Sequence, residues 1–225
     1  MKKTLSLLAL LAVAGMASAP AQAATHYVSG MAGVSWMEKI NAVNTYSGYS
    51  PEYDSNYDLG AGLNLLGAVG CDYGHTRLEA ELGYQKHDFK SVDGIYWGAE
   101  NMQGDVSVSS FLVNGYYDIE LGSKVELYAT AGVGVAHLSF NGVAPADYAS
   151  DELYTWEETT TAWQIGAGLA VPISDNVKLD LRYRYFSTTD ITVSSESFFY
   201  DAADLEPVHA NVSSHSVLLG LRVDI

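Results

Sequence analysis

The sequence has few of the residues on which disulfide-bonded or nucleic-acid-binding proteins depend. Cys71 is the one cysteine among 225 residues, so no disulfide can form within the chain. Only 11 residues are Lys or Arg, whereas 27 are Asp or Glu, and the formal net charge is −16. Because phosphate binding requires a basic surface, this balance excludes nucleic acid as an expected partner.

Long hydrophobic runs are missing beyond residues 1–23. This N-terminal segment has two lysines, an apolar stretch over 5–14 and a closing Ala-Gln-Ala, the pattern of a secretory signal peptide. The stretch is shorter than the roughly 20 residues that a membrane-spanning helix needs. We predict a signal peptide at 1–23 and one mature domain at 24–225. Such a domain can enter a membrane only as a closed barrel, because lipid satisfies no free backbone N–H or C=O group.

The mature chain repeats segments in which apolar and polar residues alternate, the pattern of β-strands with two different faces. Eight such segments are present, at 28–36, 59–71, 76–86, 105–119, 125–138, 159–172, 176–188 and 212–225. The connections between them are alternately long and short, and the short ones carry turn residues. We therefore predict an all-β fold, an eight-stranded antiparallel up-and-down transmembrane β-barrel. Its termini and short turns would lie in the periplasm and its long loops outside the cell.

Alternation alone does not decide which face meets lipid, because a soluble ligand-carrying barrel turns its apolar face inward. In the segment 176–188, Leu179 and Leu181 share one face and Arg182 and Arg184 share the other. Each arginine placed in hydrocarbon would cost about 2–4 kcal/mol. Glycine also gathers on the polar face, where a narrow barrel needs small residues. Both observations favour an apolar exterior and a polar lumen.

Two groups of residues follow from this orientation. Aromatic side chains at the ends of the apolar face should form girdles at the membrane boundaries; they are Trp36, Tyr84, Tyr117, Trp163 and Tyr185. Charged side chains of both signs in a lumen only wide enough for side chains should pair; they are Glu79, Glu81, Glu126, Lys178, Asp180, Arg182, Arg184 and Arg222. We expect this ion-pair network to close the lumen, with a small low-conductance channel as the alternative.

Six short motifs resemble the OmpA-like outer-membrane β-barrel family, which includes small surface-antigen and opacity-type barrels. They are Tyr27-Val-Ser-Gly-Met-Ala-Gly33, Asn114-Gly-Tyr-Tyr-Asp118, Ala131-Gly-Val-Gly-Val135, Ala162-Trp-Gln-Ile-Gly-Ala-Gly168, Asp180-Leu-Arg-Tyr-Arg-Tyr185 and His215-Ser-Val-Leu-Leu-Gly-Leu-Arg222. The resemblance implies assembly by the outer-membrane insertion machinery, contact with outer-membrane lipid and lipopolysaccharide, and a role in envelope integrity, adhesion or antigenicity. One departure is the final residue, Ile225, where the family usually has Phe or Tyr.

An enzymatic alternative rests on a second resemblance. Some lipid A deacylases are eight-stranded barrels with a His-x-Ser pair and a later carboxylate, which together activate the serine. His137, Ser139 and Asp151 are the corresponding weak candidates. Asn follows the serine in the deacylase motif but not here, so we expect the chain not to be an enzyme.

The loops predicted at 139–158 and 189–211 are acidic and contain no Lys or Arg. Carboxylates suit hard divalent cations, so these loops are candidate cation sites, including bridges to lipopolysaccharide phosphates. The alternative is a solvated surface whose charges repel one another. None of the acids has calcium-loop spacing, and His209 and His215 lack a defined third ligand, so we expect no bound cofactor. Loop tyrosines and phenylalanines are candidate adhesive contacts, and we expect a monomer.

Overall fold

The structure, a computed structural model, describes residues 24–44, 53–94, 98–120, 125–146, 154–193 and 208–225. The predicted signal peptide lies outside these ranges. The described chain forms twelve strands: β1 Thr25–Met37, β2 Ile40–Asn44, β3 Tyr53–Leu59, β4 Ala61–Asp72, β5 Thr76–Gly94, β6 Gly98–Glu120, β7 Glu126–Pro145, β8 Tyr154–Pro172, β9 Val177–Thr188, β10 Ile191–Val193, β11 Val208–Ala210 and β12 Ser213–Asp224. No helix in the described ranges is long and apolar enough to cross a membrane.

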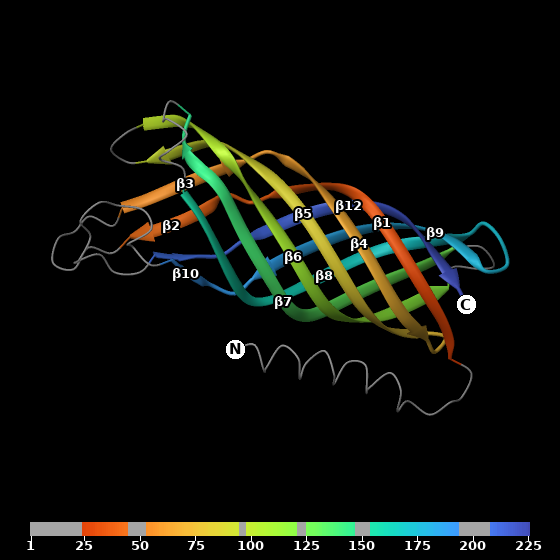
Figure 1. Ribbon diagram of the computed structural model, residues 1–225. Helices are drawn as coiled ribbons and strands as arrows, with labels where there is room; N and C mark the ends of the chain where they lie inside the picture. Colours follow the sequence, from red (N-terminus) through yellow and green to blue (C-terminus); the bar gives the residue numbers. More distant parts are fainter. Residues whose placement is uncertain (1–23, 45–52, 95–97, 121–124, 147–153, 194–207) are drawn as a thin grey trace.

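Eight of these strands form a closed antiparallel ring in the order β1-β4-β5-β6-β7-β8-β9-β12. The ring closes between the first and last strands, where Gly30 of β1 lies opposite Leu221 of β12. Its strands cross the barrel obliquely, and the C-terminus lies at the end opposite to β2, β3 and β10 (Figure 1). The predicted eight-stranded up-and-down barrel is confirmed.

The two faces of the ring differ as the alternation predicts. On the outside, Leu82, Val133 and Leu219 are between 53% and 65% exposed. On the inside, Glu81 and Arg182 are 2% exposed or less. An outward apolar belt around a charged interior is the reverse of a soluble barrel, and it suits lipid because charged groups are withdrawn from the hydrocarbon.

The strands extend further beyond the apolar belt than we predict from the sequence. The region 87–104 was expected to be a loop, yet β5 and β6 remain paired until Gly94 lies opposite Gly98. Likewise β7 and β8 continue into the predicted loop 139–158. The four short strands β2, β3, β10 and β11 join this same end of the barrel, which we call the outer end (Figure 1). The loop lengths predicted there are therefore wrong.

The polarity of the wall reverses at the outer end. Val106 and Val108 point inward and are at most 1% exposed, while His137 and Ser139 lie on the outer face of β7. The inward residues form one apolar cluster: Met37, Ile40, Leu59, Phe89, Val106, Val108, Leu112, Ala136, Leu138, Phe140, Val143, Ala162, Phe186, Ile191 and Val212. Water replaces lipid outside this part of the wall, so the hydrophobic effect drives apolar side chains inward. The expectation of a polar lumen therefore holds only for the inner half.

Candidate functional site: the lumen and the outer end

Charged side chains meet in the inner half of the lumen. Arg182 on β9 donates from Nη1 to Glu81 Oε2 on β5 at 2.9 Å. The Nη2 of Arg184 lies 3.4 Å from Glu81 Oε1, and the Nη2 of Arg182 lies 3.9 Å from Glu79 Oε1. All four side chains are almost completely buried. Burial removes solvent screening, so each charge depends strongly on its partner.

A second cluster of ion pairs surrounds Glu126 at the start of β7, nearer the periplasmic end. Its carboxylate lies 2.6 Å from Lys178 Nζ and 2.5 Å from Arg222 Nη2. Arg77 Nη2 is a third cation, at 3.9 Å. Together with the pairs around Glu81, these contacts connect β5, β7, β9 and β12 through the lumen.

The predicted set of lumenal charges omitted Arg77 and Asp118. Arg77 Nε donates to Asp118 Oδ2 at 2.7 Å and its Nη2 to Oδ1 at 2.8 Å, the forked geometry of a strong Arg–carboxylate pair. Both residues lie within the predicted segments 76–86 and 105–119 and share the lumenal parity of Glu79 and Asn114. Following the alternation to the ends of these two segments would therefore have found them. Asp180, which the sequence placed in the network, instead accepts a hydrogen bond from Tyr128 among the described residues.

Tyrosines fill the space around these charges. Tyr27 and Tyr116 donate their hydroxyl hydrogens to Glu79 at 2.9 Å and 2.5 Å. The guanidinium of Arg77 lies 4.2 Å from the ring centre of Tyr116 and 4.9 Å from that of Tyr128, within cation–π range. Their bulk is accommodated by glycine: a Cβ on Gly168 would lie 2.4 Å from Tyr128 Cζ.

Charge in the described lumen is balanced. The cations Arg77, Lys178, Arg182, Arg184 and Arg222 are equal in number to the anions Glu79, Glu81, Asp118, Glu126 and Asp180. Four of these five anions lie within 4.0 Å of a cation, and the fifth, Asp180, accepts a hydrogen bond from Tyr128.

The candidate catalytic residues lie elsewhere, on the outer face of the outer end. His137 Nδ1 is 3.0 Å from Thr159 Oγ1, and its Nε2 is 3.6 Å from Glu157 Oε2. The hydroxyl of Ser139 contacts Asn141 at 3.5 Å rather than His137. The third candidate, Asp151, lies outside the described residues. The described part of the predicted set therefore does not form the hydrogen bond that would activate a serine.

The five predicted girdle residues all point away from the lumen. Trp36, Tyr84, Tyr117 and Trp163 are between 37% and 59% exposed, and Tyr185 is half-buried. Trp163 and Tyr185 are neighbours, with ring centres 5.5 Å apart.

His215 lies beside these outward aromatics. Its Nδ1 is 2.6 Å from the hydroxyl of Tyr183, and its Nε2 is 3.0 Å from Glu38 Oε1. Both ring nitrogens thus have partners on the outside of the wall, so the sequence suggestion of a metal ligand at His215 has a simpler explanation.

Most of the acids proposed for cation binding lie outside the described residues, as do Tyr46, Tyr49 and Phe198 among the loop aromatics. Within the described ranges, no three His, Cys, Asp or Glu side chains come together as a metal site. Glu157, the described loop acid with a partner in the structure, is paired with His137.

Comparison with known proteins gives the same architecture. The outer membrane protein beta-barrel domain family matches residues 6–222. Outer membrane protein PagN of Salmonella typhimurium is 26% identical over 213 residues, which cover 87% of each chain. Neisserial surface protein A has a similar fold, with a TM-score of 0.53 at 17% identity, over 91% of this chain and 100% of the other.

A candidate adhesin of Rickettsia typhi is 26% identical over 118 residues. That match covers 52% of this chain and 52% of the rickettsial protein, so about half of the length of each is compared.

Proposed function

Because this chain belongs to the outer membrane protein beta-barrel domain family, we propose that it is a surface adhesin of the bacterial outer membrane. The membrane location follows from the family and from its relatives. Adhesion is supported by the rickettsial relatives that are described as candidate adhesins. The apolar belt contacts outer-membrane lipid, and the outer end carries the contact with other cells.

The observation that carries this proposal is the paired strand structure of the outer end. β5 and β6 pair beyond Tyr84, as far as Gly94 and Gly98, and β2 and β3 add two more strands beside them. A wall that projects past the membrane presents a broad, ordered surface to the outside, which a barrel with short loops lacks. Ordered surfaces lose little conformational entropy on binding.

Adherence of a non-adherent bacterial host that expresses the full chain tests the proposal. We expect such cells to bind cultured epithelial monolayers several-fold better than cells that express the eight-stranded ring with the outer end replaced by short turns. Equal adherence of the two strains, at equal surface amounts of protein, would overturn it.

We also propose that the lumen is closed. The inner half is filled by the ion pairs around Glu81 and Glu126, and the outer half by the apolar cluster of the outer end. A dry apolar layer opposes ion passage because ions lose hydration there. Planar-bilayer recording of the purified protein should show no steady conductance. A stable open level would favour the small channel.

The proposed role is not enzymatic. Its support is that the compared relatives are described as an outer membrane protein and as candidate adhesins and that Ser139 contacts Asn141 instead of His137.

A further inference from the structure

In the part of the chain that the structure describes, the first residues of β8, at the outer end, have a strand partner on only one side. β8 pairs with β7 from Tyr154 to Ala170. On its other side, pairing with β9 begins at Ala162, opposite Thr188. In the described chain no strand pairs with the preceding residues on that side, because β10, which continues the chain from β9, pairs with β11 instead.

The direction of the unpaired backbone groups follows from the ladder itself. Thr189 N donates to Thr161 O at 2.9 Å, so the peptide groups of Thr161 face the β9 side. Backbone groups alternate sides along a strand. The N–H and C=O groups of Thr155, Glu157 and Thr159 therefore face the same, open side. We call these residues the β8 edge.

Of the features that protect natural sheet edges, the β8 edge has charge, from Glu157 and Glu158, but no lysine, proline or bulge of its own. Lysine, proline, bulges and very short strands prevent unwanted pairing at such edges. Residues 155–161 are Thr-Trp-Glu-Glu-Thr-Thr-Thr, and Thr and Trp favour strands. The nearby β-bulge lies on the neighbouring strand β7, at 140–143, and not on β8. Trp156 stacks on Phe140 at 4.1 Å between ring centres, which holds the strand against the apolar cluster.

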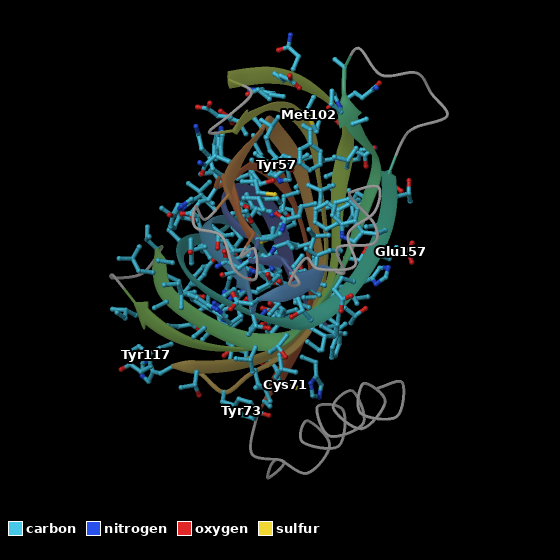
Figure 2. The ribbon with its side chains drawn as sticks, turned by 90° about the vertical axis from the view of Figure 1, so that its left-hand side faces the viewer. Tyr57, Cys71, Tyr73, Met102, Tyr117 and Glu157 are labelled. Carbon is cyan, nitrogen blue, oxygen red and sulfur yellow. The ribbon has the colours of Figure 1, made fainter. Side chains whose placement is uncertain are left out.

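The negative charge of the β8 edge indicates which kind of segment could pair with it. Glu157 is 64% exposed on its side chain and lies on the outside of the wall in the view onto the outer end (Figure 2); Glu158 is its neighbour. A second copy paired antiparallel about these residues would place glutamates opposite glutamates, which destabilises a ladder. The chain's own segments 147–153 and 194–207 carry only acidic charges. A segment with Lys or Arg opposite the glutamates is favoured instead.

We propose that the β8 edge binds an extended, basic segment of a partner protein, which adds a strand to the wall. This inference rests on the proposed adhesive function and names its contact. Main-chain hydrogen bonds to Thr155, Glu157 and Thr159 supply affinity, and the two glutamates select the sequence. The contact between Glu157 and His137 then gives way to an ion pair between Glu157 and the incoming segment.

Binding of a fluorescent peptide of alternating Lys, Thr and Val to the full chain in detergent micelles tests the inference. Fluorescence anisotropy should show binding of this peptide and not of its Glu-for-Lys counterpart. N-methylation of alternate peptide residues should abolish binding in one register and spare it in the other, because only one set of N–H groups faces the edge. Binding that ignores N-methylation overturns the inference and leaves a purely electrostatic contact.

Variants of the edge provide a second test. Thr159→Pro removes an N–H on the open side and no backbone hydrogen bond to β7, and should weaken peptide binding by about tenfold or more. It also removes the side-chain contact with His137, which is why a control that lacks the same side chain is needed. Thr159→Ala, which removes the same side chain and keeps the N–H, is the matched control. The pair Glu157→Gln and Glu158→Gln should weaken binding, and Glu100→Gln on β6 should not. If Thr159→Pro does not fold, the N-methylated peptides on the wild type decide.

The outcomes separate this inference from adhesion itself. Suppose that cells with the wild-type protein adhere, and that the Thr159→Pro variant adheres and binds the peptide equally well. The proposed binding at the β8 edge is then overturned, and the adhesin proposal stands. If cells that express the protein do not adhere, but the purified protein binds the basic peptide in one register only, the result supports binding at the β8 edge and overturns the adhesin proposal. A wild-type dimer that becomes a monomer in Thr159→Pro shows that a second copy occupies the edge, which overturns the basic partner.

Discussion

Arg182 and Glu81 stand on strands that are diametrically opposite in the eight-membered ring, yet Nη1 and Oε2 are 2.9 Å apart. Arg184 approaches the same carboxylate from β9 at 3.4 Å. The lumen at this level is thus spanned by side chains, and one glutamate lies within ion-pair distance of two buried guanidinium groups.

Glu81→Gln should therefore destabilise the barrel strongly. It leaves Arg182 and Arg184 buried without their main counter-charge, and breaking buried pairs costs about 3–5 kcal/mol. The unfolding midpoint in urea, read from the mobility difference of unheated and heated samples on gels, should fall clearly below the wild-type value. Glu100→Gln, at an exposed site on β6, is the control and should unfold like the wild type. Equal midpoints for both variants would contradict an energetically important pair.

Glycines on the two faces should respond differently to the same substitution. A Cβ on Gly134, which faces the lumen, would lie 2.0 Å from the backbone oxygen of Phe111, whereas a Cβ on Gly115 meets nothing within 4 Å. Gly134→Ala should cost about 3 kcal/mol or prevent folding, because a strand must shift. Gly115→Ala should be nearly neutral in the same urea titration. Similar losses at both sites would show that the faces are wrongly assigned.

Single-tryptophan variants should report the orientation of the wall in lipid. Trp36 and Trp163 point outward, whereas Trp156 stacks on Phe140 at the outer end. Vesicles with bromine on the acyl chains near the headgroups should quench the first two strongly and Trp156 weakly, since bromine quenches on contact. If Trp156 alone were strongly quenched, the membrane boundary would lie at Trp156 and not at Trp36 and Trp163, which would contradict the predicted girdle.

His137→Ala should leave lipid A unchanged. His137 is 3.6 Å from Glu157, and Ser139 contacts Asn141, so no activated serine is formed in the described residues. Mass spectra of lipid A from cells that express the wild type, His137→Ala or Ser139→Ala should be the same as those of cells without the gene. Acyl loss that needs both residues would establish the hydrolase instead.

Much of the fold can be predicted from local patterns because the membrane imposes a sharp contrast between faces. In β9 the contrast between the two leucines on one face and the two arginines on the other is enough to predict which face points outward. The structure confirms this, because Leu179 and Leu181 are exposed and Arg182 and Arg184 are buried. The same rule failed past residue 86 of β5. Beyond that residue the wall is surrounded by water, and its apolar side chains point inward. The sequence pattern of a strand in this environment resembles that of a polar loop.

The individual contacts could not be predicted in the same way. Which lumenal charges meet depends on the stagger between strands, and sequence periodicity carries no information about stagger. This is why Arg77 was not paired with Asp118, and why Asp180 was assigned an ion pair although Tyr128 is its partner.

The alternation along the chain is enough to predict that it crosses the membrane as strands and which face of each strand meets lipid, because charge in hydrocarbon is too costly to misplace. The tertiary structure alone decided that the outer half of the lumen is apolar and that Glu81 serves two arginines from across the ring. It also decided that β8 has an unpaired edge among the described strands. These features depend on where the ring closes and where the chain after β9 turns away from β8, and both are set by contacts between residues far apart in the chain.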